Sequence, residues 1–222
     1  MATSSTQEEV RAAKIAAMGL ELGELHFLLW HDVAWLHLKW QEFRELFATS
    51  ESRIALMNKT APEFFSNLER VLWQDVLLHL SRLSDPPGTG GQRNVSVRGL
   101  TPLVVGGLRG ELNRGLDDFE DKTRFARDWR HRLYAHRDLE HAATPSARPL
   151  EPASRAKVEE ALASLRWLMN LIEGHYQKGE VAYADATRAG DGAYMLLWYL
   201  DSGLEADEKR RGGHGLWRPR FK

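Results

Sequence analysis

The fold class follows from the stretch TAPEFFSNLERVLWQDVLLHLSRLSD, which spans residues 60–85. Its apolar side chains recur at spacings of three and four for about six turns, as in an amphipathic helix. Thr60 and Glu63 have the spacing of a capping box, and Pro62 lies in the first turn, where its missing amide costs nothing. The two prolines that follow Asp85 are expected to end the helix.

The helical period continues on both sides of this stretch. A capping box at Thr6–Glu9 begins a helix that runs to about Phe47, with Gly19 and Gly23 as weak points. Further helices are expected at about 101–105, 108–141, 154–176 and 191–208, separated by loops at 84–98 and 142–152. Asn94–Val97 is the only strand candidate, so the sequence predicts an all-α bundle of about five to seven helices.

Length and composition exclude several classes of protein. The 222 residues suit one domain, or one domain with short appendages. Thirty basic and 31 acidic residues give a net charge of -1, so no global field steers the chain to nucleic acid or to a membrane. The chain has no cysteine, which excludes disulfides, thiolate zinc sites, iron–sulfur clusters and cysteine nucleophiles.

The sequence contains no recognisable targeting or membrane segment. Met1–Val10 lacks the basic and then apolar order of a signal peptide. Leu25–Trp40, the most apolar stretch, is interrupted by charged residues and histidines, whereas a membrane span needs about 20 predominantly apolar residues. We therefore expect a soluble, cytoplasmic protein with no membrane partner.

One segment, RFARDWRHRLYAHRD at residues 124–138, is unusually rich in arginine and histidine. It contains five arginines and two histidines but only two aspartates within 15 residues. A guanidinium group binds phosphate through its planar fork, and histidine titrates near neutral pH. Metal-free RNA cleavage needs such groups: a base for the ribose 2′-proton, cations for the phosphorane and an acid for the leaving 5′-oxygen.

Within this segment, Arg130-His131, four further residues and His136 resemble the signature of the HEPN superfamily. That signature is an arginine, a polar residue, a short spacer and a histidine. Three further segments are similar to those of AbiU2-type HEPN proteins: Leu78-x-Leu80-Ser81-Arg82-Leu83-x-Asp85, Arg93-Asn94-Val95-Ser96 and Ala135-His136-Arg137-Asp138. The resemblance covers about residues 20–175.

The resemblance implies an all-helical HEPN-like bundle over residues 1–177 that dimerises and brings two Arg–His motifs into one cleft. Many members are metal-independent endoribonucleases of toxin and abortive-infection systems, which act in phage defence. On this chain, Arg130 is expected to bind phosphate, His136 to be the catalytic histidine and His131 to orient the site. RNA is the expected substrate and no cofactor or metal is implied, while an antitoxin or another defence-system partner is compatible with the family.

The flanking arginines Arg127, Arg132 and Arg137 are our own candidates for RNA contacts. On an ideal helix Arg130 and His136 lie about 120° apart, whereas Arg132 and His136 lie about 40° apart, so spacing alone favours Arg132. The family motif favours Arg130, provided that the helix is irregular or that each arginine works with the histidine across the dimer. Some HEPN toxins have a tyrosine that is modified by an antitoxin, two residues after the histidine; Asp138 occupies that position, so this regulation is not expected.

Two other interpretations of the segment remain open. The chain could be a non-catalytic HEPN module that binds RNA or a partner protein. It could also be a helical structural subunit whose arginines only form ion pairs. The candidate acidic partners are Asp117, Asp118, Glu120, Asp121 and Asp128.

Other histidines and the C-terminus give weaker signals. His26, His31 and His37 are spaced by five and six, which spreads them around a helix, so a metal site is not expected. Residues 178–222 are predicted to form a short helix followed by a basic tail. From Lys209 this tail has six basic residues and no acidic one, with Trp217 and Phe221 interleaved. Such a tail suits single-stranded nucleic acid, or it is a chain end without function.

Overall fold

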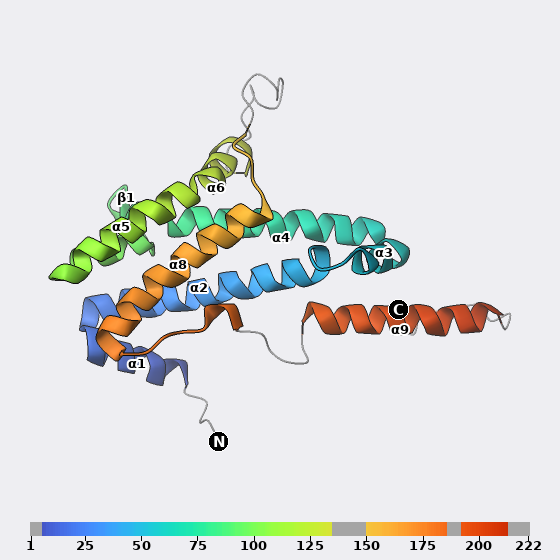
Figure 1. Cartoon of the computed structure of the whole chain (residues 1–222), viewed down its shortest axis with the longest axis horizontal. Coiled ribbons are helices and arrows are strands. Elements are labelled where there is room, and N and C mark those ends of the chain that lie inside the picture. Colours follow the sequence, from blue (N-terminus) through green and yellow to red (C-terminus); the bar gives the residue numbers. More distant parts are fainter. Residues whose placement is uncertain (1–5, 135–149, 186–191, 213–222) are drawn as a thin grey trace. The chain divides into compact units, whose positions relative to one another are not determined.

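The computed structural model describes residues 6–134, 150–185 and 192–212. Within these ranges the chain is helical apart from loops and one short pairing of extended residues (Figure 1). The α-helices are α1 (Gln7–Met18), α2 (Leu20–Phe47), α3 (Glu51–Thr60), α4 (Pro62–Leu83), α5 (Gly107–Lys122), α6 (Arg124–Trp129), α8 (Arg155–Gln177) and α9 (Ala193–Gly212). The other elements are the 3-10 helices η1 (Val97–Leu103) and η3 (Tyr183–Asp185), the π-helix η2 (Arg130–Tyr134), and β1 (Gly88–Thr89) paired antiparallel with β2 (Gln92–Arg93). The predicted all-α class is confirmed.

The chain divides into two compact units, each made of two separate segments. Unit 1 comprises Met1–His37 and Gln74–Ala186, and unit 2 comprises Leu38–Trp73 and Thr187–Lys222. The long helices α2 and α4 contribute residues to both units. The predicted division of the chain at residue 177 stays a prediction.

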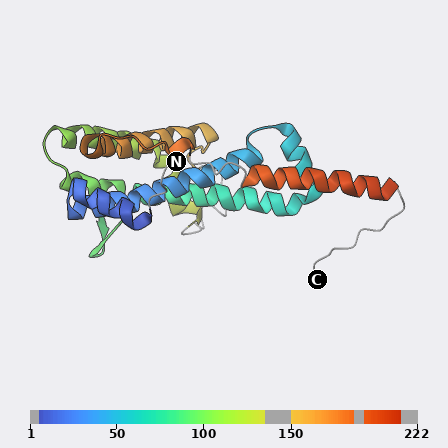
Figure 2. The same ribbon diagram turned by 90° about the horizontal axis from the view of Figure 1, so that it is seen from below.

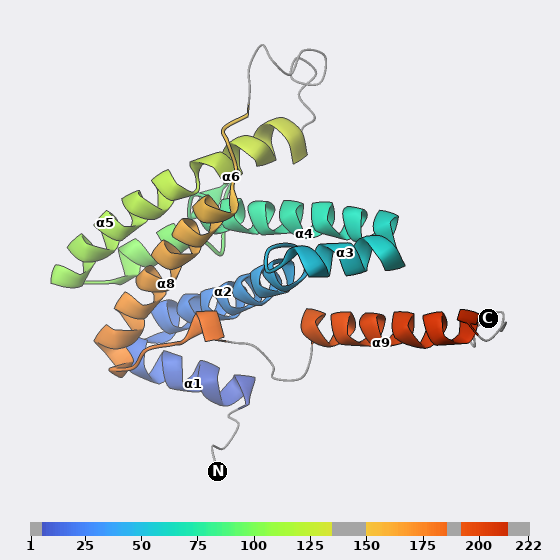
Figure 3. The same ribbon diagram turned by 45° about the vertical axis from the view of Figure 1, so that its right-hand side comes forward.

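Unit 1 is built from the first part of α2, the second part of α4, and the helices α1, α5 and α8. α5 lies alongside α8, as Figures 1 and 3 show. The most apolar stretch of the sequence falls in α2, where its side chains enter the core, and no helix in the described ranges is long and apolar enough to cross a membrane. The completely buried residues include Leu29, Val33, Leu36, Val76, Leu77, Leu80, Leu112, Leu162 and Leu165.

Two glycines shape the start of unit 1. The predicted capping box at Thr6 and Glu9 is present, and α1 ends at Gly19, whose φ of 83° favours glycine. Gly23 is not a break, because α2 continues through it. A Cβ at Gly23 would lie 2.6 Å from the backbone Cα of Ile15, so this glycine lets α1 and α2 approach closely.

The structure differs from the sequence expectation in several places. Thr60, expected in a capping box of α4, is the last residue of α3, and its hydroxyl donates to the carbonyls of Leu56 and Met57. The helix α3 was not expected; Ser50 caps it by accepting a hydrogen bond from the amide of Arg53. The extended residues are β1 and β2, not Asn94–Val97, and Figure 2 shows this hairpin extending beyond the helices. The single helix expected at 108–141 is divided at Thr123, whose hydroxyl donates to the carbonyl of Phe119 at 2.8 Å, and residues 135–141 lie outside the described ranges.

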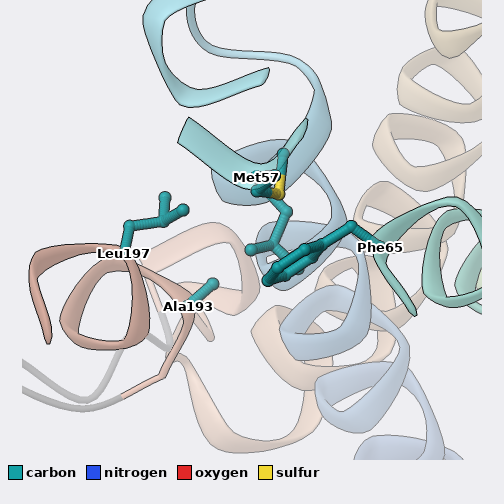
Figure 4. Packing of buried hydrophobic residues seen from close by; sticks show 5 residues of the cluster. Met57, Phe65, Ala193 and Leu197 are labelled. Atoms are coloured by element: carbon teal, nitrogen blue, oxygen red, sulfur yellow. The ribbon is translucent and has the colours of Figure 1, made fainter. Parts of the chain in front are cut away.

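Unit 2 has its own small core. Met57 of α3, Phe65 of α4 and Ala193 and Leu197 of α9 point toward one another, together with Leu46 of α2 (Figure 4). α9 is longer than the helix expected at 191–208. The amide of Ala193, at its first residue, donates to the carboxylate of Glu42 at 2.6 Å. The preceding Gly192 has a φ of 88°, and a Cβ there would lie 2.3 Å from the same carboxylate, so only glycine fits.

Candidate functional site

The described part of the arginine-rich segment, residues 124–134, lies on α6 and η2, at the C-terminal end of α4 (Figures 1 and 3). Its helix is irregular, because α6 ends at Trp129 and Arg130 begins the π-turn η2. π-turns are rare and occur frequently at functional sites. An irregular helix, one of the two conditions under which the family motif favours Arg130, is therefore present at this residue.

Arg130 is held by the end of α4. Its Nη1 donates to both carboxylate oxygens of Asp85, each at 2.8 Å, and to the hydroxyl of Ser81 at 3.4 Å. The side chains of Arg130 and Asp85 are 31% and 24% exposed, so the pair lies at the surface of unit 1. Among the described residues, no hydrogen-bond partner is found for Nε or Nη2 of Arg130, so that edge of the guanidinium faces away from the carboxylate.

The backbone around Asp85 is fixed on both sides. The amide of Asp85 donates to the carbonyl of Arg82 at 3.1 Å, which extends the last turn of α4. Asn94, across the hairpin, donates from its side chain to the carbonyl of Pro86 and from its backbone to that of Pro87, both at 2.9 Å. Asn94, from the resembling segment Arg93–Ser96, thus holds the two prolines that directly follow the resembling segment Leu78–Asp85.

A second ion-paired arginine, Arg127, lies about one helical turn before Arg130. Nη1 of Arg127 donates to the carboxylate of Glu120 at 3.0 Å, and its Nη2 donates to the carbonyl of the same residue at 2.9 Å. Arg98 of η1 forms an ion pair with the same carboxylate. Burial lowers the pKa of Arg127, and the charge of Arg124 adds to this effect, although a guanidinium remains protonated near neutral pH. Arg98 was missed by the sequence analysis, because it lies outside the segment and its spacing gives no signal.

Arg132 has a different environment from Arg130. It is 8% exposed, and its Nη1 approaches the carboxylate of Asp128 at 3.3 Å. That carboxylate also accepts from the amide of Glu151 at 2.8 Å, which attaches the start of the following segment to α6. Helical spacing favoured Arg132 for a role with His136, but the structure places Arg132 in a largely buried ion pair.

The remaining predicted site residues divide into two groups. His131 lies on η2 and is exposed. His136 and Arg137 lie outside the described residues, so their positions relative to Arg130 stay predictions. Ion pairing within the segment was one interpretation of the sequence, and it is found for Arg127 with Glu120 and for Arg132 with Asp128.

The histidines of α2 are separate from this site. His26 and His37 are buried, and burial lowers their pKa values to about 3 and about 4. His26 lies 3.6 Å from the carboxylate of Glu173, which forms a buried ion pair with Lys14 at 2.7 Å. No group of three or more histidine or carboxylate side chains in the described ranges is placed to hold a metal ion.

Comparison with protein-family models identifies a family for this chain. The family model HEPN_AbiU2, described as AbiU2, matches residues 19–194, which is more than half of the chain. The matched range contains Ser81, Asp85 and the whole arginine-rich segment, and extends beyond the expected limit of about residue 175. No curated protein sequence and no solved structure matches the chain.

Proposed function

The chain belongs to the AbiU2 family of HEPN domains, and on that premise we propose that it is a metal-independent endoribonuclease of an abortive-infection or toxin system. The observation that supports this proposal is the Arg130 guanidinium, which is anchored through one nitrogen and leaves its other edge available for a phosphate. Arg127 and Arg98 add positive charge beside it, which suits a polyanionic substrate.

In the proposed reaction, the ribose 2′-oxygen attacks the adjacent phosphorus and the bond from phosphorus to the 5′-oxygen breaks. Arg130 stabilises the charge of the phosphorane, because a guanidinium fork matches two phosphate oxygens. His136 transfers a proton, either from the 2′-hydroxyl or to the leaving 5′-oxygen, and His131 orients the site. The products are a 2′,3′-cyclic phosphate and a 5′-hydroxyl.

The proposed assembly is a homodimer in the cytoplasm, in which two Arg–His motifs share one cleft. Pairing across the dimer also relieves the geometric difficulty that Arg130 and His136 lie about 120° apart on one ideal helix. An antitoxin or another defence-system partner is proposed to restrain the nuclease until infection.

The proposal is tested with purified full-length protein and labelled single-stranded RNA in the presence of EDTA. We expect the wild type to produce 2′,3′-cyclic phosphate ends, and His136→Ala and Arg130→Ala to lower the cleavage rate by about 100-fold or more. His175→Ala is the matched control, because His175 is an exposed histidine at the far end of α8. Cleavage by His136→Ala at the wild-type rate would contradict the proposed role of the motif.

A second candidate function is a non-catalytic module that binds RNA or a partner protein. It is favoured by the ion pairs of Arg127, Arg130 and Arg132, because a guanidinium held by a carboxylate is less available to stabilise a phosphorane. RNA binding that weakens with salt, without any product, is the result expected for this candidate.

A further inference from the structure

Asp85 binds Arg130 in a way that fixes one end of the guanidinium. Both carboxylate oxygens accept from the single nitrogen Nη1, at 2.8 Å each, and the hydroxyl of the buried Ser81 lies 3.4 Å from the same nitrogen. A side-by-side pairing would instead use two nitrogens of the fork. Because only Nη1 is used, Nε and Nη2 form a free edge with respect to the described residues.

The backbone that carries this carboxylate is held in place. Asp85 follows the last turn of α4, where its amide donates to Arg82, and Asn94 holds the next two carbonyls of the chain. An arginine side chain, in contrast, has many rotamers and loses entropy when it is ordered. A carboxylate on a backbone held in this way, bound to one nitrogen, therefore orders the guanidinium before a substrate arrives.

We propose that Asp85 is a positioning residue for Arg130, which holds Nη1 so that the Nε and Nη2 edge faces an RNA phosphate. This inference rests on the proposed function, in which Arg130 is the phosphate-binding group. Asp85 does not touch the RNA, and it acts through the orientation of the guanidinium.

The negative charge of Asp85 has an opposite effect, which makes the inference testable. A carboxylate beside a phosphate-binding arginine lowers the local positive potential and weakens the attraction of RNA. If Asp85 only restrained Arg130, its removal would therefore increase both RNA affinity and cleavage. If Asp85 positions Arg130, its removal decreases the rate constant for cleavage while RNA binding is unchanged or tighter.

The first experiment compares Asp85→Ala, Asp85→Asn and the control Asp32→Ala in the RNA cleavage assay. Asp32 of α2 pairs with Arg82 of α4 at 2.9 Å, and the side chain of Asp32 is 26% exposed. Its removal therefore breaks a similar Arg–Asp pair near the same end of α4. We expect Asp85→Ala to lower kcat by about 10- to 100-fold without raising KM. Asp85→Asn keeps an oxygen that accepts from Nη1, so it recovers most of the lost kcat, and Asp32→Ala retains the wild-type kcat.

A double-mutant cycle then separates positioning from general damage to the fold. Because Asp85 acts only through Arg130, Asp85→Ala is expected to have no further effect on kcat in an Arg130→Ala background. Thermal unfolding of each variant, followed by circular dichroism, checks that the fold is retained. Additive losses of kcat, or wild-type or faster cleavage by Asp85→Ala, would overturn the inference.

If the wild type does not cleave RNA, that result contradicts the proposed function but not the positioning role of Asp85. A spectroscopic measurement tests the positioning role in that case. In nitrogen-15 NMR spectra of the full-length chain, the guanidinium signal of Arg130 is assigned by its loss in Arg130→Lys. We expect slow rotation of this group in the wild type and in Asp32→Ala, and fast rotation in Asp85→Ala. Equal mobility of Arg130 in the wild type and in Asp85→Ala overturns the positioning role.

Discussion

Arg130 and Arg132 are two residues apart and have different environments. Arg130 reaches the carboxylate of Asp85, just after the end of α4, and its side chain is 31% exposed. The side chain of Arg132 is 9% exposed and pairs within its own segment. The sequence could predict that the segment matters, because five arginines in 15 residues are visible without a structure. It could not predict the contact between Arg130 and Asp85, because 45 residues separate the two and local periodicity contains no information on such pairs.

The different burial of these arginines predicts different effects on stability. Arg132→Ala leaves Asp128 without its cation in a partly buried position, so we expect the free energy of unfolding to fall by about 1–2 kcal/mol. Arg124→Ala is the control, because Arg124 is 66% exposed and lies 3.7 Å from Asp121; its removal is expected to change the stability by less than about 0.5 kcal/mol. Urea unfolding followed by circular dichroism measures both values, and equal losses in the two variants would show that burial does not separate them.

At the scale of elements, most helices could be predicted because their signals are local. The capping box at Thr6 and the serine cap at Ser154 form as expected, and α8 begins at Arg155. α3 was missed because its ten residues contain few apolar side chains at helical spacing and depend on Ser50 as a cap. Gly23 was misread as a weak point because the close approach of the α1 backbone is a tertiary contact.

This close approach predicts a large effect for a small substitution. In Gly23→Ala the new Cβ meets backbone atoms of Ile15 and Lys14 at 2.6–2.7 Å, so α1 must move away from α2. We expect a loss of about 1–3 kcal/mol in the free energy of unfolding. Gly110→Ala in α5 is the control: its Cβ meets nothing within 4 Å, so replacing a helical glycine by alanine is expected to stabilise by about 0.5–1 kcal/mol. The prediction is wrong if both variants have the same midpoint of urea unfolding.

At the scale of the whole molecule, the balanced net charge of -1 gives no indication of which polar groups are buried. The structure buries His26 beside Lys14 and Glu173, and His37 between the carbonyl of Val33 and the guanidinium of Arg166. The spacing of the histidines in α2 argued against a metal site, but it could not predict which of them would be buried.

These histidines predict acid sensitivity of the fold. Their pKa values in the folded state, about 3 for His26 and about 4 for His37, lie below the ordinary value of 6.5, mainly because of burial. The unfolded chain therefore binds more protons than the folded chain below pH 6.5, so stability is greatest above that pH and falls as the pH is lowered toward 4. Urea unfolding at pH 7.5, 6 and 5 measures this loss. His37→Gln is expected to make the dependence on pH shallower, and an unchanged slope would contradict the assignment.

Each unit consists of two chain segments, and this arrangement has a consequence for synthesis on the ribosome. Asp85 leaves the ribosome 45 residues before Arg130, which corresponds to about 2–9 s of elongation. Ala193, whose amide binds Glu42, is synthesised 151 residues after Glu42, which corresponds to about 8–30 s. A nascent chain thus possesses both members of the Asp85–Arg130 pair while α9 has still to be translated. A transcript that ends after α8 still encodes the candidate phosphate-binding arginine together with its anchor.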